Sequence, residues 1–390
     1  MNDGKPAVYV LFGATGDLAQ RKILPALCSL HEKGILSEDA AIIAFSRRPW
    51  MDADYRAFAE PALKGFPPEA AGRLLSRIRY VQGTFDDSAG FVRLKELVGE
   101  REAFYHLAIQ PEFYTHVVEG LGKAGLKGTL LIEKPFGHDL ATAQALEKSI
   151  EEYFNLAQIE RVDHYLGKEG LDAFLERRRG DAQFEASLAN EEVASVTCRL
   201  LESLDVEGRG EFYDTVGALK DVGQNHMLEM LATVLMRLPQ DHEAIPAARA
   251  QALAAVTPRM AVRGQYEGYT QEHGVASSSQ TETYFKLTAS SAEARWQGTE
   301  LVLEGGKALN EKKSVIELAY KDGRREAFDM ERPRTRDAYE AVIEAALSGD
   351  HSRFAGREEV LAAWRFTDQA AGVMRAAPLA AYAKGSAGPR

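Results

Sequence analysis

Apolar residues gather in short runs along the first part of the chain, and stretches of helical character separate these runs. The first run, residues 7–12 (AVYVLF), is β-branched and aromatic and ends at a glycine, which is typical of a buried strand. Apolar residues then recur on one helical face over residues 17–33. The same pattern predicts further strands at 41–46, 77–85, 103–109, 128–136 and 158–165, with a helix at 139–155. Such alternation predicts an α/β domain of the Rossmann type, a doubly wound parallel sheet.

The pattern changes after residue 165. A helix is predicted at 168–180, a strand at 192–201 and a long amphipathic helix at 217–238. Residues 281–320 contain alternating strands typical of an antiparallel sheet. The tail is helical over 337–377, and the last eight residues, AKGSAGPR, are expected to form a loose end. The sequence therefore predicts two closely packed domains, residues 1–165 and an α+β domain with a mainly antiparallel sheet at 166–390.

Charge and cysteine usage narrow the classes of function. A chain of 390 residues suits two or three domains, and its net charge of -11 disfavours nucleic acid or an anionic membrane as a partner. A small anionic substrate stays possible, because a basic pocket can lie inside an acidic protein. Cys28 and Cys198 lie far apart without metal-ligand spacing, which favours a reducing compartment and no metal site. Without a signal-peptide pattern or an apolar run of membrane-spanning length, we expect a cytoplasmic protein.

A glycine turn, GATGDLAQRK, joins the first strand to the first helix. Gly13 and Gly16 allow a tight turn and close approach of the backbone to a pyrophosphate at the helix N-terminus, and Thr15 offers a hydroxyl. The third glycine of the usual dinucleotide fingerprint is absent. The alternative is a strand-to-helix turn that binds nothing.

The end of the second strand distinguishes the two nicotinamide cofactors. An NAD enzyme often places an acid there for the ribose hydroxyls, whereas this chain has Ser46, Arg47 and Arg48. A guanidinium suits the 2′-phosphate of NADP, since it can donate paired hydrogen bonds. The residues favour NADP over NAD, with a solvated basic loop as the alternative.

Several motifs together resemble the glucose-6-phosphate dehydrogenase family. They run in family order over nearly the whole chain: GATGDLAQRKILPAL, EKPFGHDL, RVDHYLGKE, EGRGEFYDTVGALKDVGQNHMLEML, RGQYEGY, TETYFKL, RWQGTELVLEGGKALNEKK and DAYEAVIEAALSGD. The resemblance implies oxidation of D-glucose 6-phosphate at C1 to 6-phospho-D-glucono-1,5-lactone with NADP, the entry step of the pentose phosphate pathway.

The resemblance also implies roles for individual residues. The catalytic set is the general base His226, the orienting acid Asp163, and Lys134 near the reacting hydroxyl and the nicotinamide. The residues that match substrate-binding positions are His164, Tyr165, Lys168, Glu202, Asp221, Lys307 and Lys312. Those that match cofactor-binding positions are Gly13, Ala14, Thr15, Gly16, Asp17, Leu18, Lys22, Arg47 and Lys134.

The chemistry independently suits these residue types. Oxidising a hemiacetal requires a base with a pKa near neutrality, and an imidazole needs a carboxylate to select its tautomer. Asp163 and His164 are neighbours, but side chains that leave a strand in succession point to opposite sides, so we expect Asp163 to serve His226 instead. His164, Tyr165 and Lys168 offer several donors for a phosphate, and a solvated helix start is the alternative.

Some positions depart from the family pattern. The chain is shorter between Lys307 and Asp337 and at the C-terminus, so a second NADP site is not expected, although a homodimer or homotetramer through the C-terminal sheet is. Gln110 stands where a proline is usual, and Lys312 replaces a frequent arginine. Two rival functions remain: an oxidoreductase of the glucose-fructose oxidoreductase type acting on another sugar, and a nucleotide-binding relative without activity.

Overall fold

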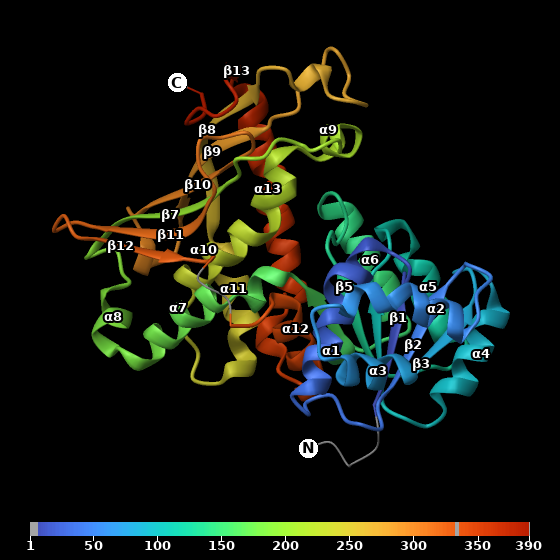
Figure 1. Cartoon of the computed structure of the whole chain (residues 1–390). Coiled ribbons are helices and arrows are strands. Elements are labelled where there is room, and N and C mark those ends of the chain that lie inside the picture. The colour runs from blue at the N-terminus through green and yellow to red at the C-terminus, as the bar shows by residue number, and fades with distance from the viewer. Residues whose placement is uncertain (1–6, 332–334, 390) are drawn as a thin grey trace. The chain divides into compact units, whose positions relative to one another are not determined.

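The computed structural model describes residues 7–331 and 335–389 (Figure 1). The chain divides into two compact units. The first unit contains the chain up to Gly137, then Ala141–Gly167 and Arg336–Arg357. The second contains His138–Leu140, Lys168–Thr335 and the chain from Glu358 onward.

The first unit is built on a parallel sheet of six strands in the order β3-β2-β1-β4-β5-β6. All of its pairings are parallel, which confirms the doubly wound Rossmann sheet. The strands are β1 (Val8–Phe12), β2 (Ala41–Ser46), β3 (Ile78–Gln82), β4 (Ala103–Leu107), β5 (Thr129–Glu133) and β6 (Ile159–Val162). Every residue of β1, β4 and β6 is buried, as expected of strands covered on both faces.

Helices connect these strands and pack around them (Figure 1). The connection after β1 contains a π-helical turn that continues as an α-helix, and together they cover residues 19–32 of the helix predicted at 17–33. The helices of this unit are η1 (Ala19–Ile23), α1 (Leu24–Glu32), α2 (Asp52–Ala59), α3 (Pro68–Ser76), α4 (Ser88–Val98), α5 (Tyr114–Lys123), α6 (Leu140–Glu151) and α12 (Ala338–Ser348). Short helical turns lie at η2 (Glu60–Leu63), η3 (Pro111–Phe113), η4 (Leu156–Gln158), η5 (His164–Gly167) and η10 (His351–Arg353).

Helix α12 returns to the first unit from the far end of the chain. Its residues Tyr339, Val342 and Ile343 are buried in the same apolar cluster as Leu24 and Leu27 of α1. A single boundary at residue 165 therefore differs from the observed division, because the α12 segment folds with the parallel sheet. The helical pattern of the tail was predicted, whereas its packing partner was not.

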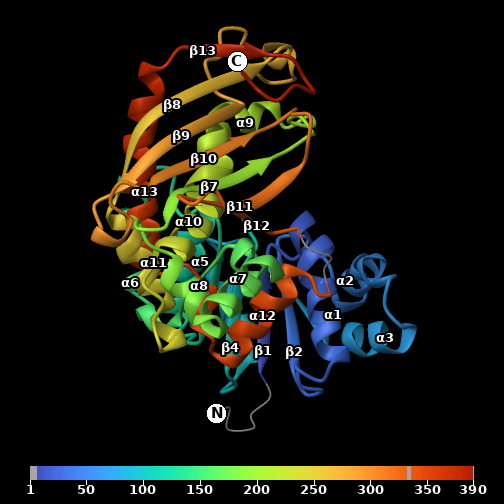
Figure 2. The ribbon, with the colours of Figure 1, turned by 90° about the vertical axis from the view of Figure 1, so that its left-hand side faces the viewer.

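The second unit is built on a seven-stranded sheet in the order β12-β11-β7-β10-β9-β8-β13 (Figure 2). Its strands are β7 (Val193–Leu201), β8 (Val256–Tyr266), β9 (Tyr284–Ser291), β10 (Glu300–Gly306), β11 (Lys313–Tyr320), β12 (Arg325–Asp329) and β13 (Leu379–Tyr382). The pairs β10–β7 and β13–β8 are parallel, and the other pairs are antiparallel. The mainly antiparallel sheet is thus confirmed.

The helices of this unit include the long helix predicted at 217–238 and others that the sequence did not predict. The predicted helix is observed as a π-helical segment η6 (Leu219–Met227) that continues as α10 (Leu228–Leu235), and α9 (Gly210–Ala218), which was not predicted, precedes it. Gly217, the first residue of the predicted helix, has a non-helical φ of 70° and ψ of 170° and separates the earlier turns of α9 from η6. The remaining helices are α7 (Glu169–Gly180), α8 (Ala182–Ser187), α11 (Ile245–Ala254) and α13 (Arg357–Ala376), with short turns η7 (His242–Ala244), η8 (Tyr269–Gln271) and η9 (Ala294–Trp296).

The C-terminal tail is not loose. After β13, Ser386 forms an isolated bridge with Leu309, and its carbonyl accepts from the backbone N–H of Asn310 at 2.9 Å. The prediction of a loose end was wrong because glycine and serine composition does not reveal backbone pairing.

Both cysteines are buried free thiols, as the sequence predicted. Burial, together with the charge of Glu32, raises the pKa of Cys28 to about 11. Among the described residues, no helix combines the length and the apolar character needed to cross a bilayer.

Candidate active site

A cavity of about 1060 Å³ opens at the carboxyl ends of the parallel strands in the first unit. The order of the strands reverses between β1 and β4, and such a switch point is where open α/β sheets bind ligands. The residues that line the cavity lie at or just after the carboxyl ends of β1 to β6 and on η3, α5 and α12: Gly13, Thr15, Gly16, Asp17, Leu18, Ser46, Arg47, Arg48, Gly83, Thr84, Phe85, Asp86, Ala108, Ile109, Gln110, Pro111, Phe113, His116, Glu133, Lys134, His164 and Tyr339.

The glycine turn forms the part of the cavity nearest β1. Gly13 has a φ of 73°, and a Cβ at this position would lie 2.1 Å from the carbonyl oxygen of Ala108. The N–H of Gly16 donates to the carbonyl of Gly13 at 2.8 Å, which closes the turn. Only glycine satisfies both the dihedral angle and the space at position 13. A backbone with this shape at a helix start fits the pyrophosphate of a dinucleotide.

Other predicted cofactor residues divide into two groups. Asp17, Leu18 and Thr15 line the cavity, and the Thr15 hydroxyl lies 3.0 Å from that of Ser46. Ala14 is buried beneath the turn, where its carbonyl accepts from the Tyr55 hydroxyl at 2.9 Å. Lys22 does not line the cavity, and its Nζ lies 2.8 Å from Oδ2 of Asp337.

Two arginines occupy the end of β2. The guanidinium of Arg48 lies over the ring of Trp50, 4.8 Å from its centroid, and Tyr80 donates to the Arg48 carbonyl at 2.7 Å. Arg47 is exposed, and the described ranges offer its guanidinium no acidic partner within 4.0 Å. This end of the cavity is therefore positively charged, and its free donors can meet an anion.

The opposite end of the cavity contains Glu133, Lys134, His164 and Tyr339. The Tyr339 hydroxyl donates to Oε2 of Glu133 at 3.2 Å, and the Tyr339 ring stacks on that of His164 at 6.1 Å between centroids. Burial raises the pKa of Tyr339, and the charge of Glu133 adds to this shift.

Several lining residues were missed by the sequence analysis. They are Thr84, Phe85 and Asp86 after β3, Phe113 and His116 near the start of α5, and Glu133 and Tyr339. The segment after β3 had a usable signal, because it follows the carboxyl end of a predicted parallel strand. Tyr339 had none, because it joins this site only through the return of α12.

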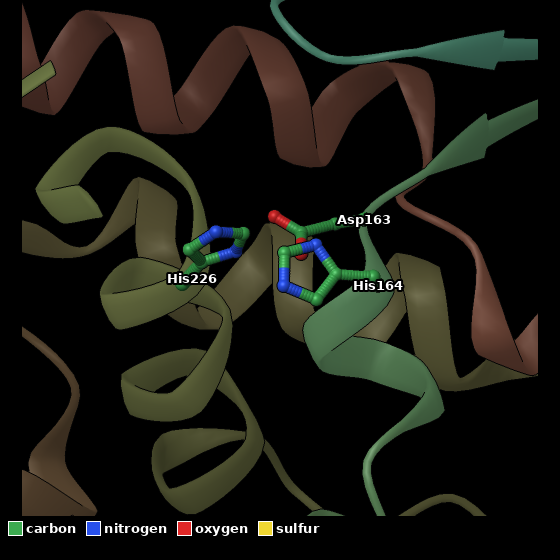
Figure 3. Close-up of side chains that lie close together, drawn as sticks. All are labelled: Asp163, His164 and His226. Carbon is green, nitrogen blue, oxygen red and sulfur yellow. The ribbon is translucent and has the colours of Figure 1, made fainter. Parts of the chain in front are cut away.

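Asp163 and His164 follow β6 where the strand gives way to η5 (Figure 3). Asp163 is buried, and its Oδ1 accepts the backbone N–H of Tyr165 at 2.8 Å. Oxygen and nitrogen ligand atoms of the Asp163 and His164 side chains lie within 4.8 Å of each other. Our expectation that they point to opposite sides was wrong, since β6 ends at Val162 and strand alternation no longer applies. Tyr165 is also buried and lies outside the cavity.

His226 projects from the π-helical segment η6 in the second unit (Figure 3). Its side chain is buried, and its backbone N–H donates to Oδ1 of Asn225 at 2.7 Å. The Asn225 amide in turn donates to the carbonyls of Lys220 and Asp221, each at 3.2 Å. These bonds fix the backbone of the segment that carries the imidazole.

Three predicted substrate residues meet in the second unit. Nζ of Lys307 lies 2.5 Å from Oε2 of Glu202 and 3.3 Å from Oδ2 of Asp221. The same ammonium lies 5.3 Å from the ring centroid of Tyr213. Burial, and then the charges of Asp221, Glu282 and Glu202, raise the pKa of Tyr213. The cluster combines one cation with two acids, a set that can bond sugar hydroxyls as donor and acceptor.

Two other predicted substrate lysines have different surroundings. Lys168 is buried at the N-terminus of α7, where its ammonium pairs with Glu331. Lys312 is exposed between β10 and β11, and among the described residues it forms no ion pair with the Lys307 cluster. The structure therefore brings Glu202, Asp221 and Lys307 together and leaves Lys312 apart.

Family comparisons cover nearly the whole chain. The sequence model for "Glucose-6-phosphate dehydrogenase, NAD binding domain" matches residues 10–172. The model for "Glucose-6-phosphate dehydrogenase, C-terminal domain" matches residues 175–336 and 329–390.

Characterised relatives agree with these models. Glucose-6-phosphate 1-dehydrogenase of Bacillus subtilis is 30% identical, with 100% of this chain and 96% of the relative covered. The Gluconobacter oxydans enzyme of the same name is 32% identical over 99% of this chain and 95% of its own length.

Solved structures show the same architecture. Glucose-6-phosphate dehydrogenase in complex with glucose 6-phosphate superposes with a TM-score of 0.92 at 26% identity, covering 100% of this chain and 96% of the other. The structure of glucose-6-phosphate 1-dehydrogenase from Mycobacterium avium superposes with a TM-score of 0.89 at 28% identity, covering 99% of this chain and 95% of the other. An oxidoreductase from Sinorhizobium meliloti superposes with a TM-score of 0.56 at 10% identity, covering 96% of this chain and 98% of the other. At this identity the two proteins share the fold alone. Matches at this coverage, from both domain models to whole-chain relatives, show that the chain belongs to the glucose-6-phosphate dehydrogenase family.

Proposed function

We propose that this chain is a glucose-6-phosphate 1-dehydrogenase that oxidises D-glucose 6-phosphate at C1 to 6-phospho-D-glucono-1,5-lactone, with NADP as the hydride acceptor. The observation that carries the proposal is the match of both family models across the chain, residues 10–172 and 175–390. When bound, the nicotinamide accepts the hydride that leaves C1.

We assign the general base to His226. The O1 proton must leave as the hydride departs, and a buried imidazole on a rigid segment can accept it. We assign Asp163 as the acid that orients this imidazole and offsets its positive charge once protonated. Support for Asp163 comes from its burial and from the DHYLGK motif that contains it.

The sugar would be bound at both ends. Glu202, Asp221 and Lys307 form a cluster that suits the hydroxyl groups. His164, Tyr165 and Lys168 are proposed for the phosphate, since charge-assisted donors bind a dianion best. Lys168 would exchange its pairing with Glu331 for the phosphate.

NADP is proposed as the preferred cofactor. The cavity is lined by Arg47 and Arg48 at the end of β2, where an NAD enzyme often has an acid. The Arg48 guanidinium already stacks on Trp50, which leaves Arg47 as the main candidate for the 2′-phosphate.

A panel of substrates tests the function directly. The purified protein is mixed with NADP and either glucose 6-phosphate, glucose or another sugar phosphate, and the absorbance of the reduced nicotinamide is followed. Turnover with glucose 6-phosphate alone is expected. Preference for another sugar would instead support the glucose-fructose oxidoreductase type of activity, and no turnover with any sugar would exclude both enzymatic functions.

Self-association and a cytoplasmic location are also proposed. The β8 strand carries Met260 and Val262, which are 68% and 47% exposed, and apolar side chains on a sheet face favour contact with a second copy. The free state of both cysteines fits a reducing compartment.

A further inference from the structure

Two interior strands of the first unit carry polar side chains at buried positions. His106 in β4 is fully buried, and Glu133 at the end of β5 is 6% exposed. Most other residues of these strands are apolar, so the two polar groups interrupt a core. Burying such groups costs free energy unless hydrogen bonds compensate, and a carboxylate costs the most. Both groups therefore need hydrogen-bond partners within the core.

The hydrogen-bond partners of this network determine where its protons lie. The Tyr9 hydroxyl lies 2.5 Å from Nδ1 of His106, and Nε2 of His106 lies 2.8 Å from Oε1 of Glu133. Within the ranges that the structure describes, the Tyr9 hydroxyl has no other hydrogen-bond partner, so it donates to Nδ1. Nε2 then carries the ring hydrogen and donates to Glu133.

Glu133 therefore accepts on both oxygens, from His106 and from the Tyr339 hydroxyl at 3.2 Å. A carboxylate that only accepts is ionised. Among residues 7–331 and 335–389, no lysine or arginine forms an ion pair with it. The network thus maintains a buried negative charge through neutral donors rather than through a cation.

This charge lies at a defined end of the cavity. The glycine turn and Arg47 follow β1 and β2, whereas Glu133 is the last residue of β5, on the other side of the point where the strand order reverses. A dinucleotide that crosses this point with its adenosine over β2 has its nicotinamide over β4 and β5. The oxidised nicotinamide ring is positively charged, and the reduced ring is neutral.

We propose that the Glu133 carboxylate, held by His106 and Tyr339, makes the site discriminate in favour of the oxidised cofactor over the reduced one. The inference rests on the dinucleotide-binding part of the proposed function and is independent of the sugar. A charge in a low-dielectric wall acts strongly on a nearby charge and weakly on a neutral ring. Lys134 lines the same end of the cavity, and its positive charge disfavours the oxidised ring. Without the carboxylate, the lysine alone would therefore favour the reduced cofactor.

The consequence is directional. Tighter binding of the oxidised form helps the cofactor to load, and weaker binding of the reduced form helps it to leave after each turnover. By linkage, the same charge lowers the reduction potential of the bound cofactor relative to the free one.

The test replaces the carboxylate by an amide. In Glu133→Gln the amide oxygen can still accept from Nε2 of His106, so Tyr9 still donates to Nδ1, and the amide nitrogen can donate to the Tyr339 hydroxyl; the variant is therefore expected to fold. Dissociation constants for NADP⁺ and NADPH are measured by calorimetry without any sugar, with NAD⁺ and NADH in parallel. The dissociation constant of the oxidised cofactor divided by that of the reduced cofactor should rise about tenfold, as expected when one partly screened charge interaction is lost.

Glu112→Gln is the matched control. Glu112 lies on η3 beside the cavity but is exposed and does not line it, so the same change of charge should leave the ratio within about twofold. If Glu133→Gln does not fold, the double variant His106→Gln, Glu133→Gln supplies a second neutral network for the same measurement. A folded neutral variant with the wild-type ratio, or with both forms weakened equally, would overturn the proposal. Failure to oxidise glucose 6-phosphate would affect the proposed function and leave this binding result intact.

Discussion

In the proposed mechanism, His226 is the residue on which the chemistry depends most. Replacing it by asparagine keeps a polar side chain on η6 but removes the proton acceptor. We expect His226→Asn to lower kcat by about 10²–10⁴-fold, the usual contribution of a general base, while KM for the sugar phosphate changes little. Steady-state kinetics with glucose 6-phosphate and NADP measure both constants.

His273→Asn provides the control for this substitution. His273 is an exposed histidine of the same unit, and its replacement should leave kcat unchanged. An unaltered kcat in His226→Asn would show that another group accepts the proton.

We propose Arg47 as the residue that determines the choice between NADP and NAD. Loss of charge-assisted hydrogen bonds to a 2′-phosphate costs about 1.5–3 kcal/mol, which corresponds to roughly ten- to a hundredfold in affinity. We expect Arg47→Ala to weaken the binding of NADP by this amount and the binding of NAD much less. Binding titrations with both cofactors measure the two affinities. Arg79→Ala removes a cation that is paired with Asp52 and should not change the NADP to NAD ratio. Equal losses for both cofactors in Arg47→Ala would exclude the 2′-phosphate contact.

Residue types alone predicted part of the cavity. Gly13, Gly16 and Arg47 were predictable because a turn and a strand end occur at fixed places in an alternating strand–helix pattern. Glu133 and His106 were not assigned to this network, although a polar residue inside a buried strand is itself a signal. Their partners Tyr9 and Tyr339 are 97 and 206 positions away from them, and no local pattern encodes such pairings.

The turn between β1 and η1 provides a prediction at the scale of the element. Gly13 combines a φ of 73° with a carbonyl oxygen that would lie 2.1 Å from an added Cβ, whereas Gly34, after α1, has a φ of 72° and no atom within 4 Å of such a Cβ. Gly34→Ala should therefore lower the free energy of unfolding by only about 1 kcal/mol, the cost of placing a non-glycine residue at a positive φ. Gly13→Ala should lose about 2–5 kcal/mol, because steric overlap adds to the same backbone cost. Urea denaturation of both variants measures the difference, and equal losses would show that the turn relaxes around a methyl group.

Elements with simple burial patterns were the predictable ones. The strands β1 to β6 are short apolar runs, and all of them were predicted near their observed bounds. β8 was missed because Pro258, Arg259 and Arg263 interrupt its alternation, and its pairing with β9 shifts register between Pro258 and Met260. The turns of α9 before Gly217 were also missed, since they form a separate helix that the kink at Gly217 divides from the predicted one.

At the scale of the whole chain, the return of α12 determines how the first unit is assembled. The segment 336–357 supplies apolar residues to the core around α1 and supplies Tyr339 to the cavity wall. The core and the cavity of the first unit therefore depend on a segment that follows most of the second unit in the sequence. A linear sequence pattern identifies the helix but not this long-range contact, which explains why a single domain boundary was expected.

The second sheet provides the last prediction, because its β8 strand exposes Met260 and Val262. The two residues are separated by two positions in one strand, so they lie on the same face of the sheet. If this face contacts a second copy, an aspartate there is desolvated without a partner on association but solvated in the monomer. We expect Val262→Asp, and more strongly the pair Met260→Asp, Val262→Asp, to raise the dissociation constant of the oligomer at least about tenfold. Light scattering after size-exclusion chromatography measures the mass across a dilution series. Leu156→Asp, a change of the same kind at an exposed position of the first unit, should leave the mass unchanged, and wild-type mass in the double variant would locate self-association on another surface.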